Sequence, residues 1–535
     1  MGLAAWQAGS GNTAAAFAAA LKRRPRPGAF LLGKASYGAG MTAIKKATAA
    51  GAGALAEREI WRAEIRETIR LAAPMALTQL GQISMMTTDL MLLGRLGDKV
   101  VAAAALAHTV LFVGFTLGMG FMQAVAPLAA QAFGARQPRM VRRALRVGLW
   151  ASLLLGVPLT LGQFWSEALL LAVGQAPEAA TLAARYSAGL AWCLVPSYIF
   201  LALRNFMSAV NRPEPALWIT LAAIPANGLL AYALIYGAMG LPRLELLGAG
   251  IATTLISIGM CIAALCIAAL RPPFKKYRVL GRCWRPDWPL MGRLIEVGAP
   301  ISGAFLLEFG VFAAAALVMG RLGTTALAAH QIALQTAAVL FMVPFGVALA
   351  ATVRVGQAAG RKDPVGTRRA GFAAILLGAL FMTGMTIIIA LARSYIPLLF
   401  LGTDATEAAA TVALAGALLV VGASFFIADG TQTVAAGALR GLNDTRMPLL
   451  FAAFSFWGVA FTGGLWLAFH LELGAVGVWI GLSVGLIVYA ALLVWRFQRL
   501  TRRGYLPALP GKPLARHLLS RSARMPPVRD SPRSD

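Results

Sequence analysis

Twelve long apolar segments constrain this 535-residue chain more than any other feature of its sequence. A helix that crosses a bilayer needs about 20 apolar residues at a rise of 1.5 Å each, and every segment reaches that length. Several are longer, which predicts tilted helices or helix ends that extend beyond the lipid. The sequence therefore predicts an all-α polytopic membrane protein. The expected spans are residues 69–93, 102–132, 145–171, 180–209, 216–238, 247–270, 292–319, 325–356, 370–392, 409–438, 449–469 and 475–496.

The charged residues lie mainly in the tails and in alternate loops. Charged residues make up only 13% of the chain, yet the formal net charge is +27. The basic loops lie around residues 134–146, 271–293, 361–369 and 496–503. Because basic loops stay in the cytoplasm, we expect a multi-pass plasma-membrane protein, in a bacterial inner membrane, with both termini cytoplasmic. This placement of Lys and Arg argues against a nucleic-acid partner.

The sequence offers little for metal or cofactor chemistry. Its four cysteines, which we interpret as structural thiols, lack ligand-type spacing, and its four histidines are scattered. A phosphate-binding Gly-x-x-x-x-Gly-Lys-Ser/Thr loop is missing from the sequence, so ATP-driven transport would need a separate subunit. We therefore expect no cofactor. The cysteines are Cys193, Cys261, Cys266 and Cys283.

The two halves of the chain repeat each other at a constant offset of 226 residues. The pairs are Ala73-Pro74 with Ala299-Pro300, Gly94-Arg95-Leu96-Gly97 with Gly320-Arg321-Leu322-Gly323, and Gln131 and Gly134 with Gln357 and Gly360. The second copy begins after six spans, so both copies have the same orientation in the membrane. This pattern predicts two pseudo-symmetric six-helix bundles around a central cavity, the architecture of a secondary transporter with alternating access.

The repeat and the composition set the expected domain boundaries. We expect a flexible N-terminal extension (1–60) that transport does not require, and a disordered cytoplasmic tail (501–535), because both are poor in long apolar runs. Between them we expect an N lobe (61–270), a basic cytoplasmic linker (271–291) and a C lobe (292–500). The protein is expected to function as a monomer surrounded by membrane lipids.

Three carboxylates fall inside predicted spans: Asp89, Glu308 and Asp429. An ionised carboxylate at membrane depth costs at least about 2.5 to 3.5 kcal/mol on insertion scales, so such residues usually face a cavity or bind cations. The alternative is a structural role, in which a nearby arginine neutralises the acid. Arg204 and Arg354 lie toward span ends, and no Lys or Arg occupies a mid-span position. We therefore interpret the three acids as a cation site.

Amide side chains accompany the acids within the predicted spans. Gln82 precedes Asp89 by two helical turns, and Gln432 follows Asp429 by three residues, so each shares a helix face with its acid. Intramembrane amides serve helix packing as well as ligand binding, and both roles stay open for each of them. His330 lies near a span end, and we expect it to be a packing residue. The candidate cavity residues are Gln82, Asn205, Asn227, Gln331, Gln335 and Gln432.

Several of these stretches together resemble the multidrug and toxic compound extrusion (MATE) transporters, specifically the NorM branch. The resemblance covers about residues 60–500. The matching stretches are Met86-Thr87-Thr88-Asp89-Leu90-Met91 with Gly94 and alanines 102–105, Gly298-Ala299-Pro300 with Glu308, Ala328-Ala329-His330-Gln331, Asp429-Gly430-Thr431-Gln432, Ala438-Leu439-Arg440-Gly441, Asp444-Thr445-Arg446-Met447-Pro448, and Leu203-Arg204-Asn205 through Asn211-Arg212-Pro213.

The resemblance implies export of organic cations, including drugs, in exchange for Na⁺ or H⁺. By motif match, it assigns the coupling-ion site of the C lobe to Glu308 and Asp429, which become the candidate Na⁺ ligands. Asp89 takes the role of the N-lobe carboxylate. One position departs from some family members, which have Tyr where this chain has Phe425, so a hydroxyl ligand is missing.

Two other functions are compatible with a polytopic chain. A flippase for lipid-linked saccharides, from the same broad superfamily, would need cavity arginines for its polyanionic headgroup, and this chain places acids there. A membrane prenyl- or acyltransferase would need a Mg²⁺-binding carboxylate pair or a His/Asp dyad at one membrane face, and the sequence shows neither. The sequence therefore favours a transporter and not an enzyme.

Overall fold

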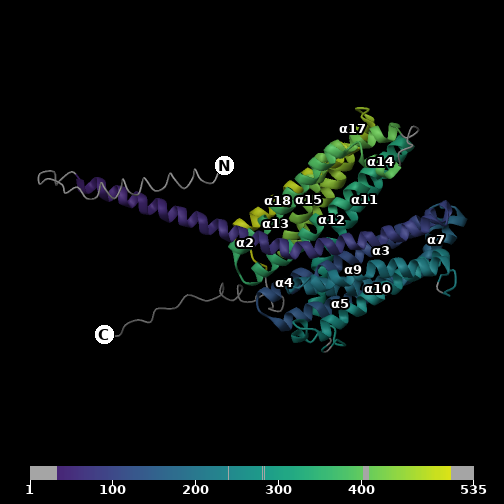
Figure 1. The fold of residues 1–535 in the computed structure, drawn as a ribbon, viewed down its shortest axis with the longest axis horizontal. Helices are drawn as coiled ribbons and strands as arrows, with labels where there is room; N and C mark the ends of the chain where they lie inside the picture. Colours follow the sequence, from purple (N-terminus) through teal and green to yellow (C-terminus); the bar gives the residue numbers. More distant parts are fainter. Residues whose placement is uncertain (1–32, 239, 280, 282, 402–408, 508–535) are drawn as a thin grey trace, which may run out of the picture. The chain divides into compact units, whose positions relative to one another are not determined.

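The computed structural model describes residues 33–507 except 239, 280, 282 and 402–408, and most side chains from residue 57 onward. Within these residues every regular element is a helix, which confirms the predicted all-α fold (Figure 1). The chain divides into two compact units, Met1–Ala63 and Glu64–Asp535. The second unit contains all twelve predicted spans.

The first described helix, α2, covers Gly33–Gly94 and so includes much of the predicted N-terminal extension. Residues 33–60 are helical, although their composition led us to expect a flexible segment. This stretch is rich in alanine, the residue with the highest helix propensity, which explains the helix. Residues 1–32 of the extension and 508–535 of the predicted tail lie outside the described residues, and the flexibility of both ends stays a prediction.

Each predicted span corresponds to one helix or to consecutive helices. In the N lobe these are α2, α3 (Asp98–Gln123) with α4 (Val125–Gly134), α5 (Pro138–Gln163) with α6 (Ser166–Ala172), α7 (Pro177–Ala191) with α8 (Leu194–Ala209), α9 (Glu214–Tyr236) and α10 (Glu245–Leu270). In the C lobe they are α11 (Trp288–Leu322), α12 (Thr324–Gly360), α13 (Pro364–Ala392), α15 (Ala409–Gly441), α16 (Arg446–Ala452) with the π-helical η2 (Ala453–Phe461) and α17 (Thr462–Phe469), and α18 (Gly474–Arg502). The short helix α14 (Ile396–Leu401) lies between two predicted spans.

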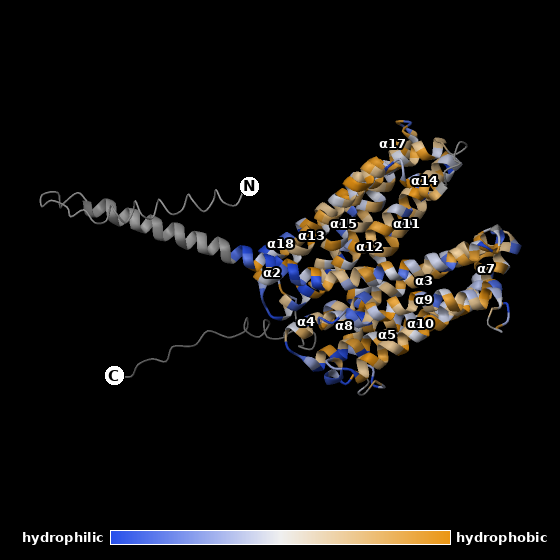
Figure 2. Cartoon of the chain, viewed as in Figure 1, coloured by the Kyte–Doolittle hydropathy of each residue, from blue (hydrophilic) through white to orange (hydrophobic). Residues whose placement is uncertain are grey.

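Most of these helices are apolar enough to cross a membrane (Figure 2). Among the described residues ten helices pass on length and composition, or eleven if α7 and α8, bent by 45°, form one span. The first predicted span, in α2, is not among them. It carries Gln79, Gln82 and Asp89, which make it more polar than the other spans and suit a helix that faces a polar site.

The linker packs against the N lobe. Its short 3₁₀ helix η1 (Phe274–Tyr277) buries both aromatic rings against Phe206 of α8, with ring centroids 6.0 and 5.6 Å away. At the linker's end Arg143 of α5 pairs with Asp287 at 2.5 Å, and this guanidinium holds the pKa of the Asp287 carboxyl below its usual range. The linker therefore contacts the N lobe at η1 and again at Asp287, the residue that precedes α11.

The two lobes meet through contacts that repeat the internal symmetry of the sequence. A Cβ atom at Gly120 of α3 would meet the backbone of Ser302 in α11, and one at Gly346 of α12 would meet the backbone of Ala76 in α2. Gly120 and Gly346 differ by the repeat offset of 226, and so do Ala76 and Ser302. The α3–α11 and α2–α12 crossings are thus equivalent, and each needs glycine for its close approach.

Four amide side chains extend the same symmetry to the ends of α4 and α12, where the two bundles converge (Figure 1). Gln131 donates to the carbonyl of Gly441 at 2.9 Å and accepts from Asn443 Nδ2 at 3.0 Å. Gln357 donates to the carbonyl of Ala209 at 3.0 Å and to Asn211 Oδ1 at 2.8 Å. We call Gln131, Gln357, Asn211 and Asn443 the interlobe clasp.

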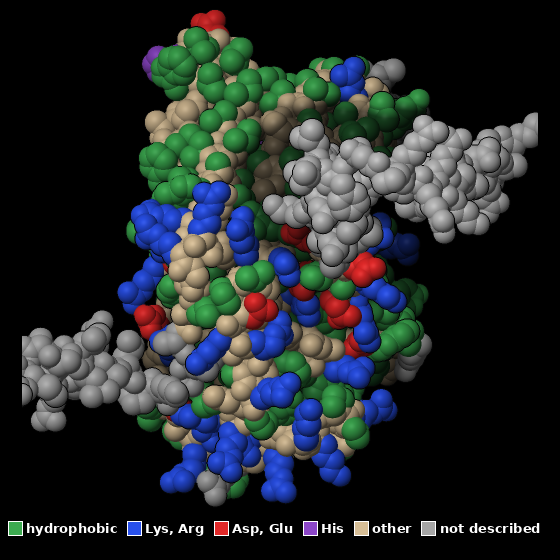
Figure 3. Space-filling view, turned by 90° about the vertical axis from the view of Figure 1, so that its left-hand side faces the viewer, with side chains coloured by type: hydrophobic (Ala, Val, Ile, Leu, Met, Phe, Trp, Pro, Cys, Tyr) green, Lys and Arg blue, Asp and Glu red, His purple; other side chains and the backbone are tan. Residues whose placement is uncertain are grey.

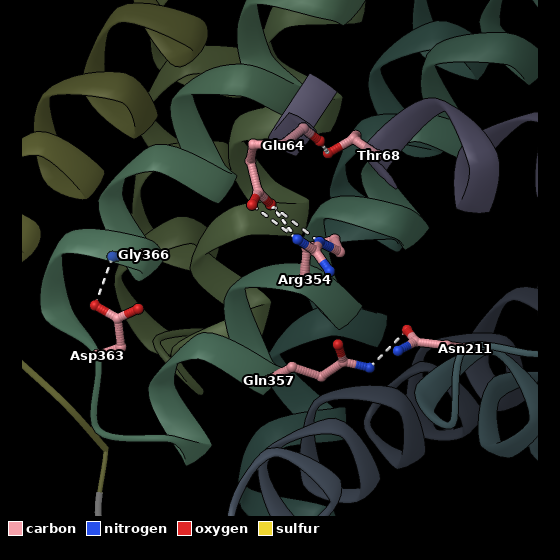
Figure 4. Close-up of polar contacts among 7 residues, drawn as sticks. All are labelled: Glu64, Thr68, Asn211, Arg354, Gln357, Asp363 and Gly366. Carbon is pink, nitrogen blue, oxygen red and sulfur yellow. Dashed lines mark hydrogen bonds and ion pairs between the residues drawn. The ribbon is translucent and has the colours of Figure 1, made fainter. Parts of the chain in front are cut away.

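The two asparagines of the clasp have left-handed backbone conformations, with φ of 61° at Asn211 and 57° at Asn443. Asparagine tolerates this region better than most residues, so both lobes use the same turn chemistry to present their amides. An ion pair next to the clasp also joins the lobes: Arg354 of α12 contacts both carboxylate oxygens of Glu64 in α2, at 2.7 and 2.8 Å (Figure 4). Both side chains are mostly buried.

Candidate functional site

The C lobe brings two of the predicted acids together through one amide. Gln432 Nε2 donates to Glu308 Oε1 at 3.0 Å and to Asp429 Oδ1 at 3.1 Å. Asp429 and Gln432 lie three residues apart on α15, on one helix face, and Glu308 projects from α11. Asp429 and Gln432 are 5% and 3% exposed. Gln432 and Asp429 share a helix face, as their spacing predicts, and the contact with Glu308 adds a second helix to the site.

A buried arginine lies near this pair. The Arg440 guanidinium stands 4.9 Å from the ring centroid of Phe305, which precedes Glu308 by one turn, and it is within electrostatic range of Glu308. Within the described part of the chain Arg440 forms no ion pair. The expectation that no fixed positive charge reaches the acids needs correction here. Arg440 follows the predicted span 409–438, but its long side chain reaches across to Phe305 on α11.

The N-lobe acid has a separate polar cluster. Asp89 Oδ1 accepts from Asn227 Nδ2 at 2.6 Å, and Asp89 Oδ2 lies 3.0 Å from Thr253 Oγ1. Asp89 is 5% exposed, and Asn227 is fully buried. The structure thus places the candidate Asn227 beside the acid, on α9. Sequence reasoning missed Thr253, because a threonine in an apolar helix usually donates to its own backbone, as Thr253 also does toward Ala249 at 3.1 Å.

The other candidate amides do not meet the acids. Asn205 is buried and donates to the backbone carbonyl of Met122 at 2.7 Å, so it serves packing between α8 and α3. The candidate Gln82 instead contacts Arg204. The Arg204 guanidinium donates to Gln79 Oε1 at 2.5 Å and to Gln82 Oε1 at 3.4 Å. Gln331 and Gln335 have exposed side chains on α12.

Trp479 of α18 contacts two residues that the sequence singled out, His330 and Phe425. His330 is fully buried and accepts a hydrogen bond from Trp479 Nε1 at 3.1 Å, which agrees with its expected packing role. Phe425, where a hydroxyl is missing, packs against Trp479 with centroids 5.3 Å apart and ring planes tilted by 50°, and it is 1% exposed. Among the described residues no group of three or more His, Cys, Asp and Glu could hold a metal ion. An ion at Glu308 and Asp429 would therefore need oxygen ligands from amides, backbone or water.

Two repeated bundles of membrane-length helices, each with a buried carboxylate at its polar centre, define a polytopic membrane transporter. Comparison with known proteins identifies the family. The MatE family model matches residues 74–233 and 300–466. The "Probable multidrug resistance protein NorM" of Rhodopseudomonas palustris is 63% identical over 86% of this chain and 97% of its own length. The protein of the same name in Mesorhizobium japonicum is 42% identical over 85% and 98%.

Solved structures show the same fold. A eukaryotic MATE transporter, AtDTX14, matches with a TM-score of 0.74 at 21% identity, over 83% of this chain and 98% of its own. A multidrug resistance MATE family transporter of the MOP superfamily, described in an outward-facing conformation, matches with a TM-score of 0.75 at 20% identity, over 82% and 96%. The chain therefore belongs to the MatE family, which confirms the resemblance. This is a transporter family, and the membrane-enzyme alternative is excluded.

Proposed function

We propose that this chain is a multidrug exporter that exchanges organic cations for Na⁺ or H⁺ by alternating access between its lobes. The relatives above are named as multidrug resistance proteins, which favours small-molecule efflux over the flippase alternative. The observation that carries the coupling proposal is the contact of Gln432 with both Glu308 and Asp429. Two helices thereby share one acidic centre, and a cation bound there would alter their relative position.

The charges around the C-lobe centre support a single monovalent coupling ion. Glu308 and Asp429, when ionised, carry two negative charges, and Arg440 provides one positive charge nearby. The remaining charge of −1 is matched by one Na⁺ or one H⁺. Because an uncompensated charge at membrane depth is costly, the empty and occupied centres differ in stability, and ion binding can shift the equilibrium between access states.

The N-lobe cluster suits substrate release. Asp89 is held by Asn227 and Thr253 but has no cationic side chain within ion-pair distance in the described structure. An organic cation would supply the missing positive charge, and a proton or conformational change that weakens this attraction would release it. The two acidic centres thus divide ion coupling and substrate handling between the lobes.

The interlobe clasp indicates that the two lobes are closed together on the side of the basic loops. The clasp and the Glu64–Arg354 pair join the lobes at the end where the basic loops gather, and Lys and Arg side chains are concentrated over the middle and lower parts of that face in Figure 3. Basic loops are expected in the cytoplasm. We infer that the cytoplasmic side is closed here and that the clasp must break for the protein to face inward.

The same proposal places the protein in the bacterial inner membrane, as a monomer among lipids, with both termini in the cytoplasm and no nucleic-acid partner. Labelling of single cysteines in intact cells tests the orientation. A cysteine at Glu178 should react with an impermeant maleimide from outside, and one at Arg278 should not. Strong labelling at Arg278 alone would reverse the topology.

Transport in proteoliposomes tests the coupling site. Fluorescent organic-cation export should respond to an imposed Na⁺ or H⁺ gradient, and Glu308→Gln and Asp429→Asn should abolish that response while keeping the side-chain shape. Glu296→Gln is the matched control, because Glu296 lies on the same helix but pairs with Arg446 at an exposed position. If both site variants export at near wild-type rates, the acids are structural and the assignment is wrong.

A further inference from the structure

A groove lies between α9 and α10 of the N lobe, away from both acidic centres. Its volume is about 920 Å³, and apolar residues of the two helices line most of it. Three charged residues lie at one end: Arg212 just before α9, Glu214 at its start, and Arg271 just after α10. Because α9 and α10 are antiparallel neighbours, the groove runs from these charges into the apolar depth of the lobe.

The length of the groove matches one leaflet of a bilayer. Its lining on α9 extends from Glu214 to Ala226, which is about 18 Å at the helical rise of 1.5 Å per residue. Half of a hydrocarbon core of about 30 Å is about 15 Å. Trp218 is 68% exposed one turn from the charged end, the depth at which tryptophan anchors helices in headgroups. The charged end therefore lies at headgroup level and the other end near the bilayer centre.

The equivalent positions in the C lobe carry a different set of charges. The turn Asn211-Arg212 corresponds to Asn443-Asp444, and in the C lobe Asp444 pairs with Arg496 near the end of α18 at 2.8 Å. The N lobe instead has two arginines, and neither Arg212 nor Arg271 forms an ion pair in the described part of the chain. Their charges are thus available to an anion from outside the protein.

We propose that this groove binds one phospholipid of the leaflet on the basic side, with an ethanolamine headgroup. The lipid phosphate lies between Arg212 and Arg271, whose guanidinium groups bind phosphate oxygens in bidentate fashion. Glu214 accepts hydrogen bonds from the headgroup ammonium, and one acyl chain fills the groove. A purely anionic headgroup would meet the Glu214 carboxylate, and an organic-cation substrate would be repelled by the two arginines.

Native mass spectrometry of the full-length chain in detergent tests this site. Phosphatidylethanolamine, phosphatidylglycerol and phosphatidylcholine are added separately, and we expect the first to bind best. Arg212→Gln with Arg271→Gln should weaken phosphatidylethanolamine binding about tenfold or more, since each basic residue contributes about 1 kcal/mol to headgroup attraction. Glu214→Gln should remove the preference over phosphatidylglycerol. Arg502→Gln with Arg503→Gln, exposed at the end of α18, is the matched control and should bind as wild type.

A second variant tests the acyl-chain part separately. Gly259 lines the groove, and a Cβ atom there would meet no heavy atom within 4 Å, so the side chain introduced by Gly259→Leu should extend into the groove. This variant should weaken phosphatidylethanolamine binding, while its thermal unfolding temperature stays near that of the wild type. Unchanged binding in both the double arginine variant and Gly259→Leu would overturn the site. A wild-type preference for phosphatidylglycerol would overturn the headgroup assignment.

Discussion

Gln131 and Gln357 occupy equivalent places in the two halves of the chain, and each crosses the interface to bond the opposite lobe. Each glutamine also lies against a glycine of the other half. A Cβ atom at Gly134 would overlap the carbonyl oxygen of Gln357, and one at Gly360 would overlap that of Gln131. The repeated Gln and Gly of the sequence are therefore partners across the lobes, and the duplication has built a symmetric closure.

Gly134→Ala should open this closure. The added methyl group cannot fit against the Gln357 carbonyl, and such overpacking costs about 1 to 3 kcal/mol in the closed state alone. The equilibrium should move toward the inward-facing state. In everted vesicles, with the native cysteines replaced, a cysteine at the buried interface residue Ala130 should then react faster with maleimide. Gly292→Ala, whose Cβ would have open space, is the control, and an equal rate in both variants would contradict the prediction.

Breaking the Glu64–Arg354 ion pair should also move the equilibrium toward the inward-facing state. Both side chains are mostly buried, at 17% and 14% exposure, so Glu64→Gln leaves an arginine with an unpaired charge and should cost the closed state about 1 to 3 kcal/mol. The exchanged pair Glu64→Arg with Arg354→Glu should recover part of the loss. Glu296→Gln breaks an exposed pair and should change little. Distances between spin labels on the two lobes, measured by electron paramagnetic resonance, report the shift.

Asp89→Asn should separate substrate handling from ion binding. The asparagine oxygen can still accept from Asn227 Nδ2, and its NH2 group can donate to Thr253 Oγ1, but the charge that attracts an organic cation is removed. Export should fall at least tenfold, while a fluorophore on the C lobe still reports an ion-dependent change, because Glu308 and Asp429 are intact. Loss of both signals would show that the two acidic centres act as one.

Asp287 should make the linker contact dependent on pH. Its pKa is lowered in the folded state, so its contribution to stability is complete above the unfolded pKa of about 3.9 and is lost as the pH falls through the folded value. Asp287→Asn should lower the thermal unfolding temperature at pH 7 by the equivalent of about 1 kcal/mol. The difference from wild type should shrink below pH 4. A difference that is constant with pH would mean that the carboxylate charge is irrelevant.

Several features were accessible from sequence because they depend on local composition. The spans, including the first one at residues 69–93 within α2, follow from the lengths of apolar runs. Asp89, Glu308 and Asp429 stood out because their charge conflicts with the lipid environment. The shared helix face of Gln432 and Asp429 followed from their spacing of three residues. The helix at residues 33–60 was missed, since alanine-rich composition fits both a tail and a helix.

The contacts between distant segments were decided by the tertiary structure. Thr253 joined Asp89, Gln432 reached Glu308 on another helix, and Arg440 came near the acids from beyond its predicted span. Each depends on how helices rotate about their axes, and successive residues turn by about 100°, so a small rotation changes which side chains meet. The sequence by itself determined the number, order and duplication of the helices, because these follow from the cost of placing polar groups in lipid. Only the packed structure decided which side chains join the lobes, because that depends on the fit of whole helix surfaces.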